Sequence, residues 1–311
     1  GDRVHPTAPD YIASLSAVLN ETFARGGNVV IPSFAVGRTQ ELLYFLRQIR
    51  HERLVKAPFK VYLDSPLAVK ATNVFNRNTA MCCDEETADL IAKGINPISF
   101  DGLITTESTE ESKAINDTPG CKVIISSSGM CDAGRIRHHL KHNLWRSDSS
   151  VLFVGYQSQG TLGRRLLDGE KNVRIFGEEI QVNARIYTLA GISGHADMNG
   201  LMRWIKGFEG HPRVFINHGE EKCADELAAR LTAVGFDASA PYSGDEYSLP
   251  DGTQVTFGSR ERVISRKQPD FASQLEAALD MLRQKIFAKD TSNERARQSL
   301  LDKIKEFARK I

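Results

Sequence analysis

The chain has 311 residues, of which 41% are hydrophobic and 25% are charged, and its formal net charge is +1. These values are typical of a globular protein with room for one large or two ordinary domains. They exclude a uniformly basic nucleic-acid binder, and no apolar run approaches the roughly 18 residues that a membrane-spanning helix needs. The five cysteines form no CxxC pair, which predicts reduced thiols and a cytoplasmic protein without a membrane partner.

The first half of the chain repeats one pattern four times. A short apolar run is followed by a loop of small or hydroxyl residues and then by an amphipathic helix. The apolar runs are residues 29–31, 61–63, 123–125 and 151–154. Alternation of such strands with helices predicts an α/β fold, in which a mostly parallel sheet carries helices on both faces.

Two segments depart from this pattern. Residues 77–118 are rich in Asn, Asp, Glu and Thr, and we expect them to form helical or irregular decoration over the sheet. Residues 173–177 and 180–187 alternate at period two, which predicts an antiparallel hairpin and favours a domain boundary near residue 172.

The last third is predicted to be a smaller α/β region with a helical tail. A helix through Leu201 and Trp204 precedes a strand at 214–217, and another helix covers 224–231. Beyond residue 258 two apolar stripes at helical spacing indicate further helices. These stripes need a cover, so we expect either back-folding or a homo-oligomer.

The loops that follow the four strands carry side chains suited to an anion. In a parallel sheet these loops gather at one edge, where ligands bind. Hydroxyls, backbone N–H groups at helix starts and a guanidinium suit phosphate oxygens. For any single loop a helix N-cap is the favoured interpretation, and the convergence of four loops gives a phosphate-bearing ligand equal weight. The residues concerned are Ser33, Arg38, Thr39, Ser65, Ser126, Ser127, Ser128, Gly129, Gln159 and Thr161.

A basic stretch between residues 135 and 142 offers a second candidate site. It contains Arg135, Arg137, His138, His139, Lys141 and His142. Such a helix face could follow a nucleic-acid backbone or be a solvated surface. His138 and His142 have the i, i+4 spacing of a metal-ligand pair, although the sequence offers no third ligand nearby.

Two histidines form the third candidate site. His195 and His218 lie in loops of small residues, with Asp197 and Glu220 close by. Each could be a metal ligand or a proton donor, or a hydrogen-bonded polar residue in a turn. The chain contains no HxHxDH or HExxH cluster, so a metal site made by these residues alone would be incomplete.

Six motifs that occur in order carry a resemblance to a known family. They cover residues 31–43, 64–68, 127–130, 160–163, 193–197 and 217–220. Together they resemble the β-CASP branch of the metallo-β-lactamase superfamily, which contains RNA-processing ribonucleases. The resemblance extends over about residues 1 to 250.

The resemblance implies a function and a set of site residues. In this family RNA lies between an inserted β-CASP domain and a metallo-β-lactamase domain, and two zinc ions activate the attacking hydroxide. By this likeness His195, with Asp197 in the same motif, is the catalytic group, as general acid or oxyanion stabiliser, and His218 is a zinc ligand. The implied RNA-facing residues are Ser33, Arg38, Thr39, Asp64, Ser65, Ser128, Gly129 and Gln159.

The sequence also departs from the family pattern. The HxHxDH loop and most other zinc ligands of the family precede a Gly-Asp-Arg stretch that corresponds to the first residues of this chain. We therefore expect the C-terminal part of such an enzyme, with zinc absent or incomplete. The expected parts are a β-CASP domain over 1–171, the end of the metallo-β-lactamase αββα sandwich over 172–258 and a helical tail over 259–311.

These observations predict the RNA-recognition and partial active-site portion of a zinc-dependent ribonuclease, inactive as an isolated chain. Two alternatives remain open at the level of sequence. One is a non-catalytic RNA-binding or assembly module. The other is a hydrolase of a small phosphorylated or acyl substrate.

Overall fold

The structure is a computed structural model that describes residues 1–259, except 6, 8, 190, 193 and 250, together with Gln298, Leu301, Asp302 and Lys305. The predicted tail at 259–311 therefore lies almost wholly outside the described residues. The chain divides into two compact units. The first contains Gly1–His211 and Glu221–Leu227, and the second contains Pro212–Glu220 and the chain from Ala228 onward.

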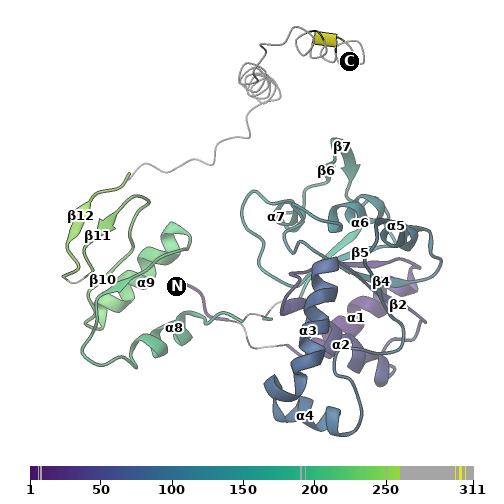
Figure 1. The fold of residues 1–311 in the computed structure, drawn as a ribbon, viewed down its shortest axis with the longest axis horizontal. Helices are drawn as coiled ribbons and strands as arrows, with labels where there is room; N and C mark the ends of the chain where they lie inside the picture. The colour runs from purple at the N-terminus through teal and green to yellow at the C-terminus, as the bar shows by residue number, and fades with distance from the viewer. Residues whose placement is uncertain are drawn as a thin grey trace. The chain divides into compact units, whose positions relative to one another are not determined.

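Helices and strands alternate through most of the first unit (Figure 1). Its elements up to the fifth strand are α1 (Tyr11–Ala24), β1 (Val29–Pro32), α2 (Arg38–His51), β2 (Lys60–Asp64), α3 (Pro66–Cys82), α4 (Glu85–Ala92), β3 (Leu103–Thr106), α5 (Thr109–Asp117), β4 (Lys122–Ser126), α6 (Ile136–Asn143) and β5 (Ser150–Phe153). The elements that follow are α7 (Leu162–Leu167), β6 (Asn172–Ile175), β7 (Glu178–Gln181), β8 (Arg185–Thr188) and α8 (Met198–Ile205). None of the helices in the described ranges has the length and apolar character that crossing a membrane requires.

Six strands of this unit form one parallel sheet, which confirms the predicted fold class. Their order is β3-β2-β4-β1-β5-β8. In the centre Val123 of β4 pairs with Val61 of β2 on one side and with Val29 of β1 on the other. Figure 1 shows α1, α2 and α3 on one side of this sheet and α5, α6 and α7 on the other.

Each face of the sheet has its own core, because side chains along a strand alternate between the faces. Val29 and Ile31 pack with the helices α1, α2 and α3, whereas Val30 packs with α5, α6 and α7. Strands buried on both faces are apolar at nearly every central position, which explains the apolar runs in the sequence. The largest fully buried side chains of both cores include Leu15, Leu19, Ile31, Leu42, Leu46, Leu63, Ile124 and Phe153.

Residues 77–118 contribute more than the decoration expected from their composition. They supply the edge strand β3, which pairs parallel with β2, and the helix α5, whose Ile115 is buried in the second core. Ser108 and Glu111 form a capping box at the start of α5, which satisfies backbone N–H groups there. The expectation of helical or irregular decoration was therefore wrong for β3, whereas α5 is helical as expected.

The alternating segment after residue 172 also differs from its prediction in one respect. β6 and β7 form the expected antiparallel hairpin, but the second run of residues divides into two strands. β8 leaves the hairpin and extends the main sheet, parallel to β5. Val173 and Ile175 pack in the second core of the first unit. The boundary near residue 172 remains a prediction.

The second unit is small and contains short strands. Its elements are β9 (Val214–Phe215), β10 (Ala238–Ser239), β11 (Glu246–Tyr247) and β12 (Gln254–Thr256), and α9 (Glu221–Ala233) ends in it. β9 and β10 pair parallel, and β11 and β12 pair antiparallel. The rings of Phe215 and Tyr247 lie 4.6 Å apart, and the Arg213 guanidinium lies over both rings.

Candidate functional site

The first unit has a topological switch point at β1. Its neighbours in the sheet are β4 and β5. The helix that follows β1, α2, packs on one face, whereas α6 and α7, which follow β4 and β5, pack on the other. Chain segments that leave adjacent parallel strands in opposite directions leave a crevice at the carboxyl ends of the strands, where ligands bind.

Three loops meet at Gly129 beside this switch point. A Cβ atom on Gly129 would lie 3.2 Å from two ring carbons of Phe34, so the loop after β1 lies directly against the loop after β4. The side-chain amide of Gln157, in the loop after β5, donates to the carbonyl oxygen of Gly129 at 2.9 Å. The backbone N–H of Gly163 donates to Met130 at 3.1 Å. The convergence expected for these loops is therefore present in the structure.

The loop between β1 and α2 is held by buried hydroxyls. Thr39 and Ser33 are each only 1% exposed. The Oγ1 of Thr39 donates to the carbonyl oxygen of Phe34 at 2.7 Å and lies 3.1 Å from the Oγ of Ser33. The Arg38 side chain is mostly buried, with 15% exposed, and its guanidinium donates to Glu41 at 2.5 Å. Ser33 and Thr39 thus brace the turn, whereas Arg38 reaches its surface.

Asp64, at the carboxyl end of β2, is the centre of a buried hydrogen-bond network. Its side chain is fully buried. Oδ1 accepts from Thr106 Oγ1 and Arg135 Nη1, both at 2.7 Å. Oδ2 accepts from Ser112 Oγ at 2.6 Å and also lies 2.6 Å from His139 Nε2. One carboxylate therefore joins β2 to β3, α5 and the start of α6.

The ionisation of Asp64 follows from these contacts. Burial alone would raise the pKa of this carboxyl, because a charge is costly away from water. The hydrogen bonds from His139, Ser112, Thr106 and Arg135 outweigh burial and hold its pKa well below the ordinary value. Asp64 is therefore an anion with both oxygens occupied, and it does not present its carboxylate to a ligand at the surface.

The other predicted loop residues differ in how far they reach solvent. Ser65 is buried and caps α3 by accepting from the N–H of Ala68 at 3.3 Å. Ser128 is partly buried, and its N–H donates to Ala133 at 3.2 Å. Gln159 is exposed in the loop after β5. The structure therefore divides the predicted set into surface residues and residues that shape the loops.

The basic stretch of α6 makes mostly intramolecular contacts. His139 is buried against Asp64, and the Arg137 guanidinium and the His138 ring each lie 4.4 Å from the ring of Phe176. Lys141 pairs with Glu178 of β7 at 2.6 Å. These contacts favour neither of the two alternatives left open by the sequence, a nucleic-acid track or a solvated face, since most of the side chains are engaged within the chain.

Sequence reasoning missed two features of this site. Arg135 and His139 have helical i, i+4 spacing, which could have indicated a common partner such as Asp64. Phe34 lies in a loop that was singled out for its polar residues, and its ring is 49% exposed. The presence of an aromatic residue between the polar residues Ser33 and Arg38 could have indicated this feature from the sequence.

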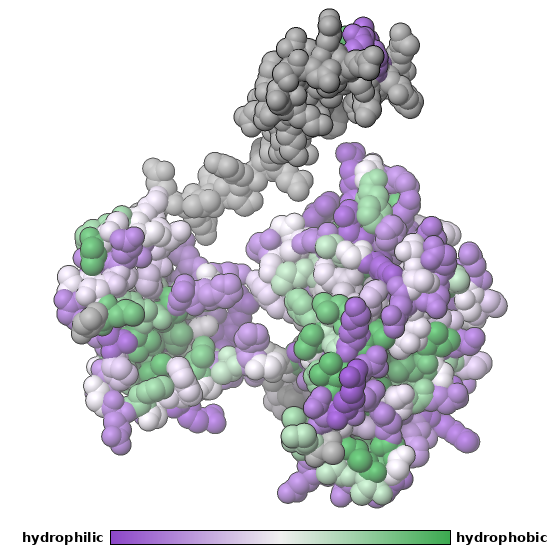
Figure 2. Space-filling model, viewed as in Figure 1, coloured by the Kyte–Doolittle hydropathy of each residue, from purple (hydrophilic) through white to green (hydrophobic). Residues whose placement is uncertain are grey.

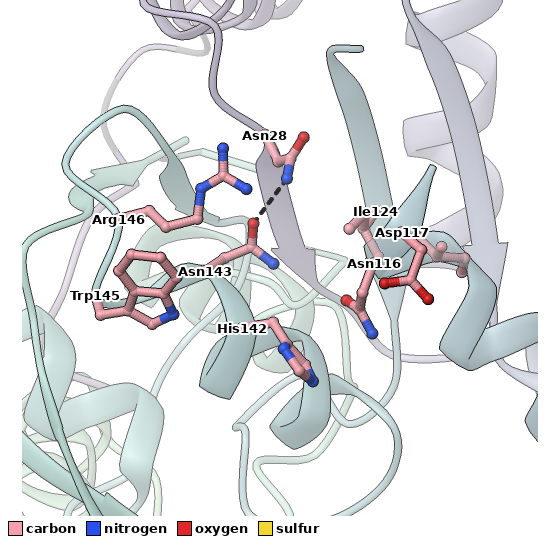
Figure 3. A pocket seen from close by; sticks show the side chains of 9 residues that line it. Asn28, Asn116, Asp117, Ile124, His142, Asn143, Trp145 and Arg146 are labelled. Atoms are coloured by element: carbon pink, nitrogen blue, oxygen red, sulfur yellow. Dashed lines mark hydrogen bonds between the residues drawn. The ribbon is translucent and has the colours of Figure 1, made fainter. Parts of the chain in front are cut away.

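A separate pocket lies at the opposite edge of the sheet, near the amino ends of β1, β4 and β5 (Figure 3). Its volume is about 190 Å³. Asn28 donates to Asn143 at 2.9 Å across its wall. The pocket contains His142 but none of the predicted RNA-facing residues. The lining residues are Asn28, Ile115, Asn116, Asp117, Ile124, His142, Asn143, Trp145 and Arg146.

His195 and Asp197 lie in the first unit, just before α8. The His195 side chain is exposed. Asp197 is the N-cap of α8: Oδ1 accepts from the N–H of Gly200 at 2.8 Å, and Oδ2 accepts from the N–H of His5 at 3.1 Å. These two backbone bonds lower the pKa of Asp197. Its observed contacts thus position the turn that carries His195.

His218 belongs to the second unit and follows β9. It is exposed and its backbone is left-handed, with φ 65°. A zinc ion in a protein takes at least three side-chain ligands. Across the described ranges no three His, Cys, Asp or Glu side chains are grouped so that they could hold a metal ion. The described residues alone therefore do not fit a complete zinc centre.

Comparison with family models identifies two domains. Residues 39–166 match the Beta-Casp domain, and residues 179–241 match the Zn-dependent metallo-hydrolase RNA specificity domain. The first match contains the Asp64 network and the loops at Gly129. The second contains His195 and His218. The predicted boundary near residue 172 falls between the two matches.

Curated relatives agree with these matches. The chain is 40% identical over 245 residues to Ribonuclease TTHA0252 of Thermus thermophilus, which covers 79% of this chain and 55% of the relative. It is 34% identical over 231 residues to transcription termination factor FttA of Methanocaldococcus jannaschii, covering 72% and 36%. The chain thus spans about half or less of the length of these proteins. The two domain matches and these relatives confirm the predicted resemblance: the chain belongs to the β-CASP family of metallo-β-lactamase-type proteins.

Proposed function

We propose that this chain is the RNA-recognition and partial active-site portion of a zinc-dependent ribonuclease, which hydrolyses RNA phosphodiester bonds. The observation that carries the proposal is the convergence of three loops at Gly129, beside the switch point of a parallel sheet. Relatives named as a ribonuclease and as a termination factor support RNA as the ligand, rather than a small phosphorylated or acyl substrate.

The residues of this edge divide into two roles in the proposal. Arg38, Ser128 and Gln159 contact RNA phosphate and sugar groups: Gln159 is exposed, and Arg38 and Ser128 are partly buried but reach solvent with part of their side chains. Gly129 lets the Phe34 ring pack closely against the loop after β4. The remaining residues, Ser33, Thr39, Asp64 and Ser65, position the loops through the hydrogen bonds described above.

The catalytic assignments concern the whole protein. We propose His218 as a zinc ligand and His195 as the group that donates a proton or stabilises the oxyanion, with Asp197 holding the His195 turn. The description of the second family match as Zn-dependent supports zinc as the cofactor. Further ligands would have to join His218, since the described residues do not group three donors. The five cysteines form no disulfide bond in the structure, which supports a reducing compartment such as the cytoplasm.

We also propose that the chain forms a homo-oligomer. Large apolar side chains are exposed in both units (Figure 2). They include Trp204 and Phe208 at the end of α8, which are 64% and 46% exposed, and Phe257, which is 73% exposed. Covering such side chains is favourable. Light scattering should therefore show association with rising concentration, reduced by Trp204→Ser. A monomer at every concentration would contradict this.

Binding of single-stranded RNA tests the main proposal through Arg38. Replacing a guanidinium that contacts phosphate weakens binding of every sequence alike and lowers the salt dependence by about one counterion. Arg38→Gln should therefore weaken binding several-fold and reduce the slope of log affinity against log salt by about 1. Fluorescence anisotropy with labelled RNA measures both quantities.

The matched control is Arg53→Gln. Arg53 is exposed two residues beyond α2, at the other end of that helix and away from the loop edge. This variant should bind RNA like the wild type. Equal losses in the two variants, or competition by a mononucleotide as effective as by RNA, would refute RNA recognition at the loop edge.

A further inference from the structure

Phe34 occupies the switch point itself. It lies two residues beyond the end of β1, between the loops that follow β4 and β5. Its ring packs against Gly129, where even a methyl group would approach to 3.2 Å, yet the side chain is 49% exposed. One part of the ring is thus fixed by the backbone of the neighbouring loop, and the rest faces solvent. An aromatic surface is held in a set orientation at the position where the fold binds ligands.

A second aromatic residue is exposed in the adjoining loop. Tyr156, beside the Gln157 that bonds to Gly129, is 51% exposed. Phe34 and Tyr156 therefore expose aromatic surface at neighbouring strand ends, which suits a ligand that has flat apolar faces.

We propose that Phe34, assisted by Tyr156, stacks on unpaired RNA bases and makes this edge selective for single-stranded RNA. Every base offers a π-face, so aromatic platforms bind single strands with little sequence preference. A duplex keeps its bases stacked inside and gains nothing from such a platform. This inference rests on the proposed RNA-binding function and adds the specificity-determining residue.

The test compares normal RNA with abasic RNA of the same length, about ten nucleotides, which keeps the phosphates and removes the bases. The complete 311-residue chain is titrated with both probes. Phe34→Leu should weaken binding of normal single strands about tenfold, the usual effect of losing one stacked base, and leave abasic binding unchanged. The salt dependence should also stay unchanged, because no phosphate contact is lost.

Two further variants separate stacking from structural damage. Phe34→Tyr keeps the aromatic face and should bind normal RNA like the wild type. Trp145→Leu removes another exposed aromatic side chain, 57% exposed at the opposite edge of the sheet, and should have no effect. Circular dichroism melting of each variant checks that the fold is retained.

The possible results distinguish this inference from the function on which it rests. Loss of affinity for normal RNA only, with recovery in Phe34→Tyr, supports stacking. Wild-type chain that binds normal and abasic RNA equally overturns stacking but leaves RNA recognition intact. Wild-type chain that binds neither probe overturns the proposed function itself. A Phe34→Leu variant that loses both probes equally assigns Phe34 a structural role and also overturns the proposal.

Discussion

A carboxylate that is buried among four hydrogen-bond donors holds the surrounding elements in place and has no oxygen left to bind a ligand. Asp64 is such a group, because its two oxygens accept from side chains of β3, α5 and the region at the start of α6. A buried charge is stable only while its partners remain in place. At the residue scale, the geometry of the loop edge therefore depends on Asp64, whereas the proposed contact with RNA depends on residues such as Arg38 and Phe34.

The network predicts an acid-sensitive stability. Asp64→Asn removes the charge that pairs with Arg135 and His139, and breaking a buried pair costs roughly 3 kcal/mol or more. The folded-state pKa of Asp64 is lowered, so its contribution is complete above the unfolded-state pKa of about 3.9 and declines as the pH falls below that value. Urea unfolding at pH 7 and below pH 4 measures both effects.

An exposed carboxylate provides the control for this measurement. Asp101 is fully exposed and pairs with Arg50 at 3.4 Å. Asp101→Asn should change the free energy of unfolding by less than about 1 kcal/mol, because surface pairs contribute little. If the two variants were equally stable at neutral pH, Asp64 would not be the centre of the network.

At the element scale, the loops are held in place where a glycine allows a helix to approach a loop closely. Gly163, in the first turn of α7, would place a Cβ atom 1.8 Å from the side-chain oxygen of Gln157. The same Gln157 donates to Gly129 and so connects the loop after β5 to the loop after β4. The position of α7 and the junction at Gly129 therefore depend on one another.

This contact reverses the usual effect of a substitution. In a helix, alanine is normally more favourable than glycine by about 1 kcal/mol. Gly163→Ala should instead lower stability by roughly 1–3 kcal/mol, the usual cost of overpacking, since Gln157 has to move. Thermal unfolding measures the change. Gly155→Ala, in the same loop and with no atom within 4 Å of the added Cβ, should be nearly neutral. A stabilised Gly163→Ala variant would show that Gln157 does not define this junction.

The elements that the sequence predicted are those with strong local signals. The strands at 29–32, 60–64, 122–126 and 150–153 are buried on both faces and therefore appear as apolar runs. β3 was not predicted, and β8 was predicted as part of a hairpin instead of the main sheet, because both are edge strands with mostly half-exposed or exposed residues. Local pattern alone does not reveal which sheet an edge strand joins.

The candidate site shows the same limit. The loop residues could be predicted, since they follow the strands directly. The pairing of Asp64 with His139 could not, because the two residues are 75 positions apart and meet only when α6 packs on the sheet. The same limit applies to the basic stretch, because five of its six side chains contact partners that are remote in sequence.

At the scale of the whole molecule, charge and function have to be reconciled. A net charge of +1 gives little general attraction for RNA, so affinity must come from a local surface. We propose that this surface is the loop edge of the first unit. The proposed catalytic histidines lie in the segment that the second family model matches. Recognition should therefore be a property of this chain even where catalysis requires more of the protein.

The affinity of the wild-type chain for single-stranded RNA, measured by fluorescence anisotropy over a range of salt concentrations, tests this central claim most directly. We expect saturable binding. The logarithm of the affinity should fall linearly with the logarithm of the salt concentration, because phosphate contacts release counterions. Unlabelled RNA should displace the probe, and a mononucleotide should not. Absence of saturable binding at low salt, or binding that salt does not affect, would contradict the account.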